Sequence, residues 1–169
     1  APLELAAELM AREHVHRVFV TDGGRPIGVL STHDIMSALI DQHCDIPIAE
    51  IMSPSIMAVQ ADDPLCVAAG RASTAQKHAM VVFDGDYPVG VLSQDELLMA
   101  RDWPADTLAE EWMSVRLLCL PQGMPVFRAA AHAQAMKVRH VIAMSERGAA
   151  GIVTGIDFAR AYPVFARAA

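Results

Sequence analysis

One stretch of sequence occurs three times in this 169-residue chain, and the three copies align without gaps. Residues 2–35 match residues 64–97 and residues 125–158. Each copy opens with Pro, carries an Ala-Ala pair four residues later, and has a Gly-apolar-apolar-hydroxyl pattern near its end. Repetition at a regular spacing is typical of small supersecondary units that recur along a chain. The sequence therefore predicts one small module that is used three times.

Each copy has the same local pattern. The proline stands at the start of an Ala-rich helix, where its missing N–H breaks no hydrogen bond. A short apolar run then predicts a buried strand, at residues 17–20, 79–82 and 140–143. Turn residues follow, then a second strand through the Gly-apolar-apolar-hydroxyl pattern. A second helix is expected to start near Asp34, Glu96 or Asp157.

Two copies also have a lead-in segment, which we define as residues 48–53 and residues 109–114, each ending in Met-Ser. A strand-like stretch follows each lead-in, so a module has three strands where the lead-in is present. The first copy has no lead-in in this sequence, and we expect it to lack its first strand. The predicted domains are copy 1 at residues 1–42, copy 2 at residues 46–102 and copy 3 at residues 107–165.

Composition narrows the functional classes. Hydrophobic residues make up 53% of the chain and the net charge is −7, so a packed core is expected and a nucleic-acid partner is not. No apolar run in the sequence is long enough to span a bilayer, and we expect no signal peptide. The three cysteines are odd in number and widely spaced, which predicts reduced thiols in a cytoplasmic protein. No histidine spacing or catalytic motif supports a metal site or an enzyme.

The order of Met-Ser lead-in, strand, Pro, helix, strand, turn, strand, Ser/Thr-x-x-Asp and helix resembles the CBS (cystathionine-β-synthase) domain over nearly the whole chain. The resemblance implies an α/β (α+β) fold of tandem CBS domains, each a small β-α-β-β-α unit, paired through their sheets into a Bateman module. It also implies a regulatory protein that needs no cofactor. Its regulatory ligand would be an adenine nucleotide (AMP, ADP or ATP) or S-adenosylmethionine, bound between paired domains.

The resemblance assigns the ribose to the acidic residue of the Ser/Thr-x-x-Asp motif and the phosphates to the helix start and nearby basic residues. These roles are chemically reasonable, because a carboxylate accepts both ribose hydroxyls and a helix N-terminus favours an anion. The candidate nucleotide-binding residues are Ser31, Asp34, Thr154, Asp157, Ser93, Glu96, Gly28, Gly151, His16, Arg17, Arg139 and His140, and copy 2 also has Lys77 and His78 before its strand.

Copy 2 departs from the motif, because Glu96 stands where the other copies have Asp. The longer side chain places its carboxylate differently, and Asp95, one residue early, is expected to point elsewhere. We therefore expect one or two sites, centred on Asp34 and Asp157. A simpler interpretation of both aspartates is helix capping, and Ser31 and Thr154 would then bond only to local backbone.

Three copies cannot all pair within one chain, which leaves one apolar sheet face open. We expect a homo-oligomer, such as a dimer, or a fourth copy in a longer parent protein, to cover that face. The controlled output would be an attached or partner effector domain. Two alternative functions stay open: a structural oligomerisation module with degenerate ligand sites, and the regulatory fragment of a larger enzyme or transporter.

Overall fold

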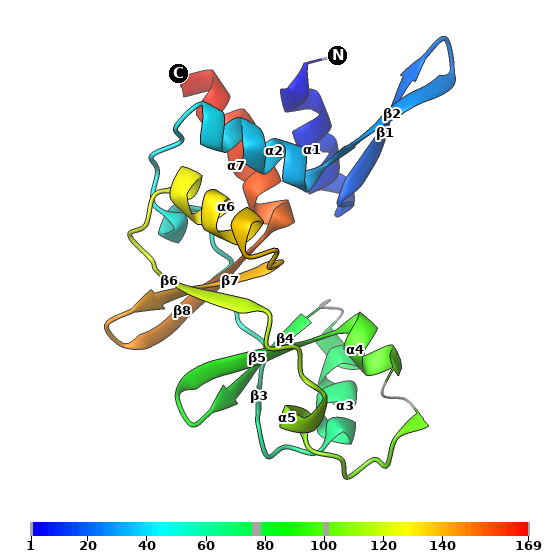
Figure 1. The fold of residues 1–169 in the computed structure, drawn as a ribbon, viewed down its shortest axis with the longest axis vertical. Helices are drawn as coiled ribbons and strands as arrows, with labels where there is room; N and C mark the ends of the chain where they lie inside the picture. The colour runs from blue at the N-terminus through cyan, green and yellow to red at the C-terminus, as the bar shows by residue number, and fades with distance from the viewer. Residues whose placement is uncertain (1, 76–78, 100–101, 169) are drawn as a thin grey trace.

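The computed structural model describes residues 2–75, 79–99 and 102–168, and its elements recur from copy to copy (Figure 1). Copy 1 has α1 (Leu3–Glu13), β1 (Arg17–Asp22), β2 (Arg25–Ser31) and α2 (Thr32–Asp41). Copy 2 has β3 (Ala58–Gln60), α3 (Leu65–Ala75), β4 (Ala79–Asp84), β5 (Tyr87–Ser93) and α4 (Gln94–Met99). Copy 3 has β6 (Leu117–Pro121), α6 (Val126–Ala135), β7 (His140–Ser145), β8 (Gly148–Thr154) and α7 (Gly155–Ala168). The lead-in segments contain the short helices η1 (Ile48–Glu50) and α5 (Ala109–Trp112).

The same antiparallel hairpin occurs in every copy, formed by β1–β2, β4–β5 and β7–β8. Its register shifts directly after Val20, Val82 and Ala143, which are equivalent positions of the repeat. In copies 2 and 3 a third strand lies parallel to the first strand of the hairpin, giving the sheets β3-β4-β5 and β6-β7-β8. The described residues of copy 1 form the two-stranded sheet β1-β2, as expected without a first strand.

The second helix of each copy was expected to start near the acidic residue of the motif. It begins two residues earlier, at Thr32, Gln94 and Gly155. The N-cap of α2 is Ser31, not Asp34. The backbone N–H and the hydroxyl of Ser31 both donate to Oδ2 of Asp34, at 2.8 and 2.7 Å. The acidic residue therefore closes a capping box from the third helical position.

Copies 2 and 3 pair through their sheets and exchange their lead-in segments. Ser53, at the end of the first lead-in, pairs with Ile152 on β8, and Ser114, at the end of the second, pairs with Val91 on β5. Residues 48–53 therefore lie on copy 3 although they precede copy 2, and residues 109–114 lie on copy 2 although they precede copy 3. The exchange gives the pair an approximate twofold symmetry.

Copy 1 packs on copy 3 through helices, with α1 beside α7 and α2 beside α6 (Figure 1). The small side chains of α6 allow close approach, and the shared core includes Met10, Ile35, Leu39, Ala129, Ala130 and Phe158, all fully or almost fully buried. Copy 2 has its own core, around Val59, Ala68, Met80 and Leu92. The β1–β2 hairpin consequently projects from the body of the molecule (Figure 1).

Candidate functional site

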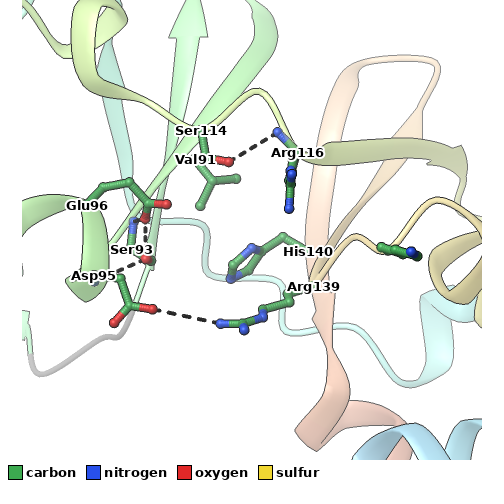
Figure 2. A pocket seen from close by; sticks show the side chains of 9 residues that line it. Val91, Ser93, Asp95, Glu96, Ser114, Arg116, Arg139 and His140 are labelled. Carbon is green, nitrogen blue, oxygen red and sulfur yellow. Dashed lines mark hydrogen bonds and ion pairs between the residues drawn. The ribbon is translucent and has the colours of Figure 1, made fainter.

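A pocket of about 340 Å³ lies between copy 2 and copy 3. This volume falls within the usual range for small-molecule sites. Copy 2 and the second lead-in that lies on it contribute one wall, and the residues directly before β6 and at the start of β7 or just before it contribute the other (Figure 2). The lining residues are Val91, Ser93, Asp95, Glu96, Ser114, Arg116, Lys137, Arg139 and His140. A ligand here would therefore touch both copies at once.

The wall from copy 2 includes the carboxylate of Glu96, which hydrogen bonds from Ser93 fix at the start of α4. The backbone N–H of Ser93 donates to Oε2 of Glu96 at 2.9 Å, and the Ser93 hydroxyl donates to the same oxygen. Burial acts to raise the pKa of Glu96, but these hydrogen bonds and the nearby His140 hold the pKa below its ordinary value. Glu96 therefore stays ionised at neutral pH and presents a carboxylate to the pocket.

The opposite wall is cationic. Arg116 follows the second lead-in, where its backbone N–H donates to the Ser114 hydroxyl at 3.3 Å. Lys137 directly follows α6 in the left-handed conformation, with a φ of 54°, and Arg139 lies just before β7. Three side chains with fixed positive charge thus line a pocket that holds two carboxylates.

His140 lies at the start of β7 between these groups. Burial lowers the pKa of His140, and the positive charges of Arg139 and His16 lower it further, against the opposing effect of Glu96. The imidazole is therefore neutral at pH 7 in the absence of a ligand. An anion in the pocket would favour its protonated form.

The expectation that Asp95 points away from the site is wrong, because Asp95 lines the pocket. Its Oδ2 lies 3.8 Å from a guanidinium nitrogen of Arg139, and both side chains, which line the pocket, are largely exposed (Figure 2). An exposed pair at this distance contributes little to stability. It joins the two copies across the pocket.

The structure brings four of the sequence-derived site residues together in this pocket: Ser93, Glu96, Arg139 and His140. Sequence reasoning missed Ser114, Arg116 and Lys137 as site residues. The Met-Ser repeat of the lead-in was the available signal for Ser114. Lys77 and His78 lie outside the described residues.

The other two acidic residues have different surroundings. Asp34 is exposed on copy 1, and the hydrogen bonds from Ser31 lower its pKa. Asp157 is 3% exposed, and its Oδ2 accepts hydrogen bonds from the backbone N–H and the hydroxyl of Thr154, both at 2.8 Å. Its Oδ1 lies 3.3 Å from the Ser53 hydroxyl and 3.1 Å from Arg160. Protein groups therefore already bind both oxygens of Asp157.

The two candidate glycines differ in their surroundings, because Gly151 lies in a packing position and Gly28 does not. A Cβ at Gly151 would lie 2.7 Å from the sulfur of Met52 and 2.8 Å from the carbonyl oxygen of Ser53, and one at Gly90 would overlap the sulfur of Met113. Each lead-in methionine thus covers a glycine of the other copy. Nothing lies within 4 Å of the equivalent position at Gly28. His16 lies beside Gly155, where its Nδ1 would be 3.4 Å from an added Cβ, and Arg17 is exposed on β1.

Among the described residues, no group of His, Cys, Asp and Glu side chains has the arrangement of a metal site. The helices within the same ranges include none long and apolar enough to cross a membrane.

The family model described as the CBS domain matches residues 1–41 and 48–102, which is more than half of the chain. The chain belongs to the CBS domain family. The model covers copies 1 and 2, and the shared hairpin register and element order extend the same module to copy 3. No curated protein sequence matches the chain.

Solved structures with the same fold include proteins from archaea and bacteria. A conserved protein from Pyrococcus horikoshii superposes with a TM-score of 0.78 at 22% identity, covering 96% of this chain and 75% of that one. A Methanocaldococcus jannaschii protein described as an archaeal homologue of g-AMPK gives 0.77 at 17% identity, covering 96% of this chain, which spans 64% of that protein's length. The CBS domain of a bacterial CNNM/CorC family Mg²⁺ transporter, in complex with ATP, gives 0.62 at 19% identity and covers 75% and 92%.

Proposed function

We propose that the pocket between copies 2 and 3 binds a phosphorylated adenine nucleotide, and that its occupancy regulates an attached or partner effector domain. The observation that carries the proposal is that the anionic and cationic groups of the pocket lie on opposite walls. The carboxylate of Glu96 stands on one copy, while Arg116, Lys137 and Arg139 stand on the other. A carboxylate suits ribose hydroxyls and a cation cluster suits phosphates, so one nucleotide would bridge the two walls.

The charge of the pocket favours ADP or ATP over S-adenosylmethionine. S-adenosylmethionine carries a positive sulfonium, which the three fixed cations would repel. Phosphates would instead meet those cations and favour protonation of His140. A related CBS domain is known in complex with ATP, which supports the same ligand class here.

Regulation follows from the bridging position. A ligand shifts a conformational equilibrium only if its affinity differs between two arrangements. A nucleotide that contacts both walls binds best when copies 2 and 3 are closely paired, and so it stabilises that arrangement. This role requires no catalytic group. We place it in the cytoplasm, where adenine nucleotides are abundant and the free thiols of Cys44, Cys66 and Cys119 stay reduced.

Isothermal titration calorimetry with AMP, ADP, ATP and S-adenosylmethionine tests the proposal. We expect ATP or ADP to bind with the highest affinity, and Arg116→Ala and Glu96→Gln to weaken binding by about tenfold or more, as for the loss of a charged hydrogen bond. Arg147→Ala is the matched control, because Arg147 is an exposed cation in the β7–β8 turn outside the pocket. Equal effects of Arg116→Ala and Arg147→Ala would overturn the assignment.

The alternative of a structural assembly module has support at copy 3. There the Ser/Thr-x-x-Asp carboxylate is bound by Thr154, Ser53 and Arg160, so the motif ties the first lead-in to copy 3 without a ligand. If no nucleotide raises the melting temperature of the protein, the structural function is the better explanation for copy 2 as well.

A further inference from the structure

Asp95 brings a second carboxylate into the pocket between copies 2 and 3, although the ligand proposed for this pocket is an anion. Its Oδ2 lies 3.8 Å from a guanidinium nitrogen of Arg139 on the opposite wall (Figure 2). The side chains of Asp95 and Arg139 are 78% and 84% exposed, so a dissolved ligand can reach both of them. A phosphate that binds Arg139 therefore meets the carboxylate of Asp95 at the same guanidinium.

The repeated module does not require a carboxylate at this position. The equivalent residues are His33 in copy 1 and Ile156 in copy 3, which are not acidic. An acidic residue in the first turn stabilises a helix, but Glu96 already provides one at the start of α4. Asp95 contributes to this helix start through its backbone N–H, which donates to the Ser93 hydroxyl oxygen at 3.2 Å. That bond does not depend on the side-chain charge, so the charge of Asp95 calls for a separate explanation.

Asp95 halves the net fixed charge of the pocket lining. The cations of Arg116, Lys137 and Arg139 face the carboxylates of Asp95 and Glu96, which leaves one net positive charge, and without Asp95 two would remain. The Coulomb energy of a ligand in this field is proportional to the charge of the ligand itself. Asp95 therefore opposes ATP more strongly than AMP. For the cationic sulfonium of S-adenosylmethionine the sign is reversed, and Asp95 attracts the ligand.

We propose that Asp95 is a specificity-determining residue of this pocket, which competes with the phosphates of a bound nucleotide for Arg139. In the unliganded protein its carboxylate pairs with the guanidinium, and a nucleotide must displace it and then bind against its repulsion. Asp95 thereby narrows the difference in affinity between nucleotides with one phosphate and those with three. It also weakens the discrimination against S-adenosylmethionine. This inference rests on the function proposed above, because it takes an adenine nucleotide as the ligand.

Isothermal titration calorimetry of Asp95→Asn tests the proposal, because this substitution removes the charge and keeps the size of the side chain. We expect ATP to bind about fivefold more tightly than to the unmodified chain, AMP to gain less, and S-adenosylmethionine to gain nothing. Asp86→Asn is the matched control, since Asp86 is an exposed acidic residue in the β4–β5 turn of the same copy, outside the pocket lining. Equal gains for AMP and ATP, a gain for S-adenosylmethionine, or the same gains in Asp86→Asn would overturn the proposal.

A double-mutant cycle tests whether Asp95 acts through Arg139. Arg139→Gln should weaken ATP binding, and Asp95→Asn should then restore much less affinity than it adds to the unmodified chain. The gain from Asp95→Asn should also shrink between about 0.05 M and about 0.5 M salt, because exposed charges are screened. Circular dichroism melting of each variant establishes that it is folded. An undiminished gain in the Arg139→Gln background would overturn the competition for Arg139.

Titration with inorganic tripolyphosphate separates this inference from the function proposed above. If ATP binds the unmodified chain and Asp95→Asn with equal affinity, the role of Asp95 is overturned and the nucleotide function stands. If tripolyphosphate binds as tightly as ATP and gains affinity in Asp95→Asn, the role of Asp95 stands and the adenine-nucleotide function is overturned. If neither ligand binds either protein, both are overturned.

Discussion

The indole N–H of Trp112 donates a hydrogen bond to the backbone carbonyl oxygen of Glu96 at 2.7 Å. The two residues come from different copies in sequence, and they meet because the second lead-in lies on copy 2. The bond ties the start of α4, where the pocket carboxylate stands, to the segment that supplies Ser114 and Arg116. Trp112 is therefore a positioning residue for the pocket.

We expect Trp112→Phe to weaken ATP binding several-fold, because the variant keeps the aromatic ring but loses one hydrogen bond, worth about 1 kcal/mol. Calorimetry measures the change. Trp103→Phe is the control, since Trp103 packs on Trp112 with ring centroids 4.6 Å apart and is not among the residues that line the pocket. If both variants bind like the unmodified protein, the Trp112 bond does not position Glu96.

Gly151→Ala should destabilise the fold by about 1–3 kcal/mol, because the added methyl group would overlap the backbone of Ser53, which cannot move as easily as a side chain. Gly28→Ala adds the same methyl group where nothing lies within 4 Å, and should change stability little or increase it slightly. Urea denaturation of the two variants measures the difference. Equal effects would show that the lead-in does not pack on Gly151 as described.

The lowered pKa of His140 predicts a pH dependence. Because the folded-state pKa lies below the ordinary value of 6.5, the unfolded chain binds this proton first. The stability that His140 contributes is complete above that value and is lost as the pH falls below it. ATP affinity should change in the opposite direction, because bound phosphates favour the imidazolium.

Urea denaturation and calorimetry at pH 7.5 and pH 5.5 measure these two effects, at values chosen to bracket an ordinary histidine. His140→Gln is the control, since it removes this titration and leaves the other groups in place. An unchanged pH dependence in His140→Gln would assign the effect to another residue.

Asp157→Ala should cost about 1–3 kcal/mol of stability, because it leaves partly buried donors at Thr154 and Ser53 and the nearby Arg160 without their acceptor. Asp34→Ala removes a similar cap at an exposed position and should cost about 1 kcal/mol. Thermal denaturation without nucleotide compares the two. A larger loss in Asp34→Ala would contradict the structural role of Asp157.

The repeat predicted the fold closely because each copy encodes its own local structure. The strands β1, β4 and β7 begin at the residues expected from their apolar runs, Arg17, Ala79 and His140. The packing of copy 1 on copy 3 was not predictable in the same way. It depends on tertiary contacts of Ala-rich helix faces, and an Ala-rich stripe such as that of α6 does not specify its partner.

The site was only partly predictable for a related reason. The motif pointed to Asp34 and Asp157, but the pocket that we describe lies at Glu96, where the motif is weakest. Motif matching compares residues within one copy, whereas the pocket needs cations from another. Arg116 reaches the pocket because the second lead-in lies on copy 2, and Lys137 reaches it through the left-handed turn after α6. Both cations are distant in sequence from Glu96, so the motif around Glu96 does not reveal them.

The exchanged lead-ins also set an order for synthesis on the ribosome. Copy 2 does not receive its lead-in until residue 114 has been made, and Ser53 pairs with Ile152, which lies nearly a hundred residues later in the chain than Ser53. Contacts this distant in sequence slow folding, and partly made chains expose the surfaces that they will later cover. A nascent chain of this protein therefore contains an incompletely folded module while copies 2 and 3 are synthesised. The first lead-in can pair through Ser53 only after β8 has been made.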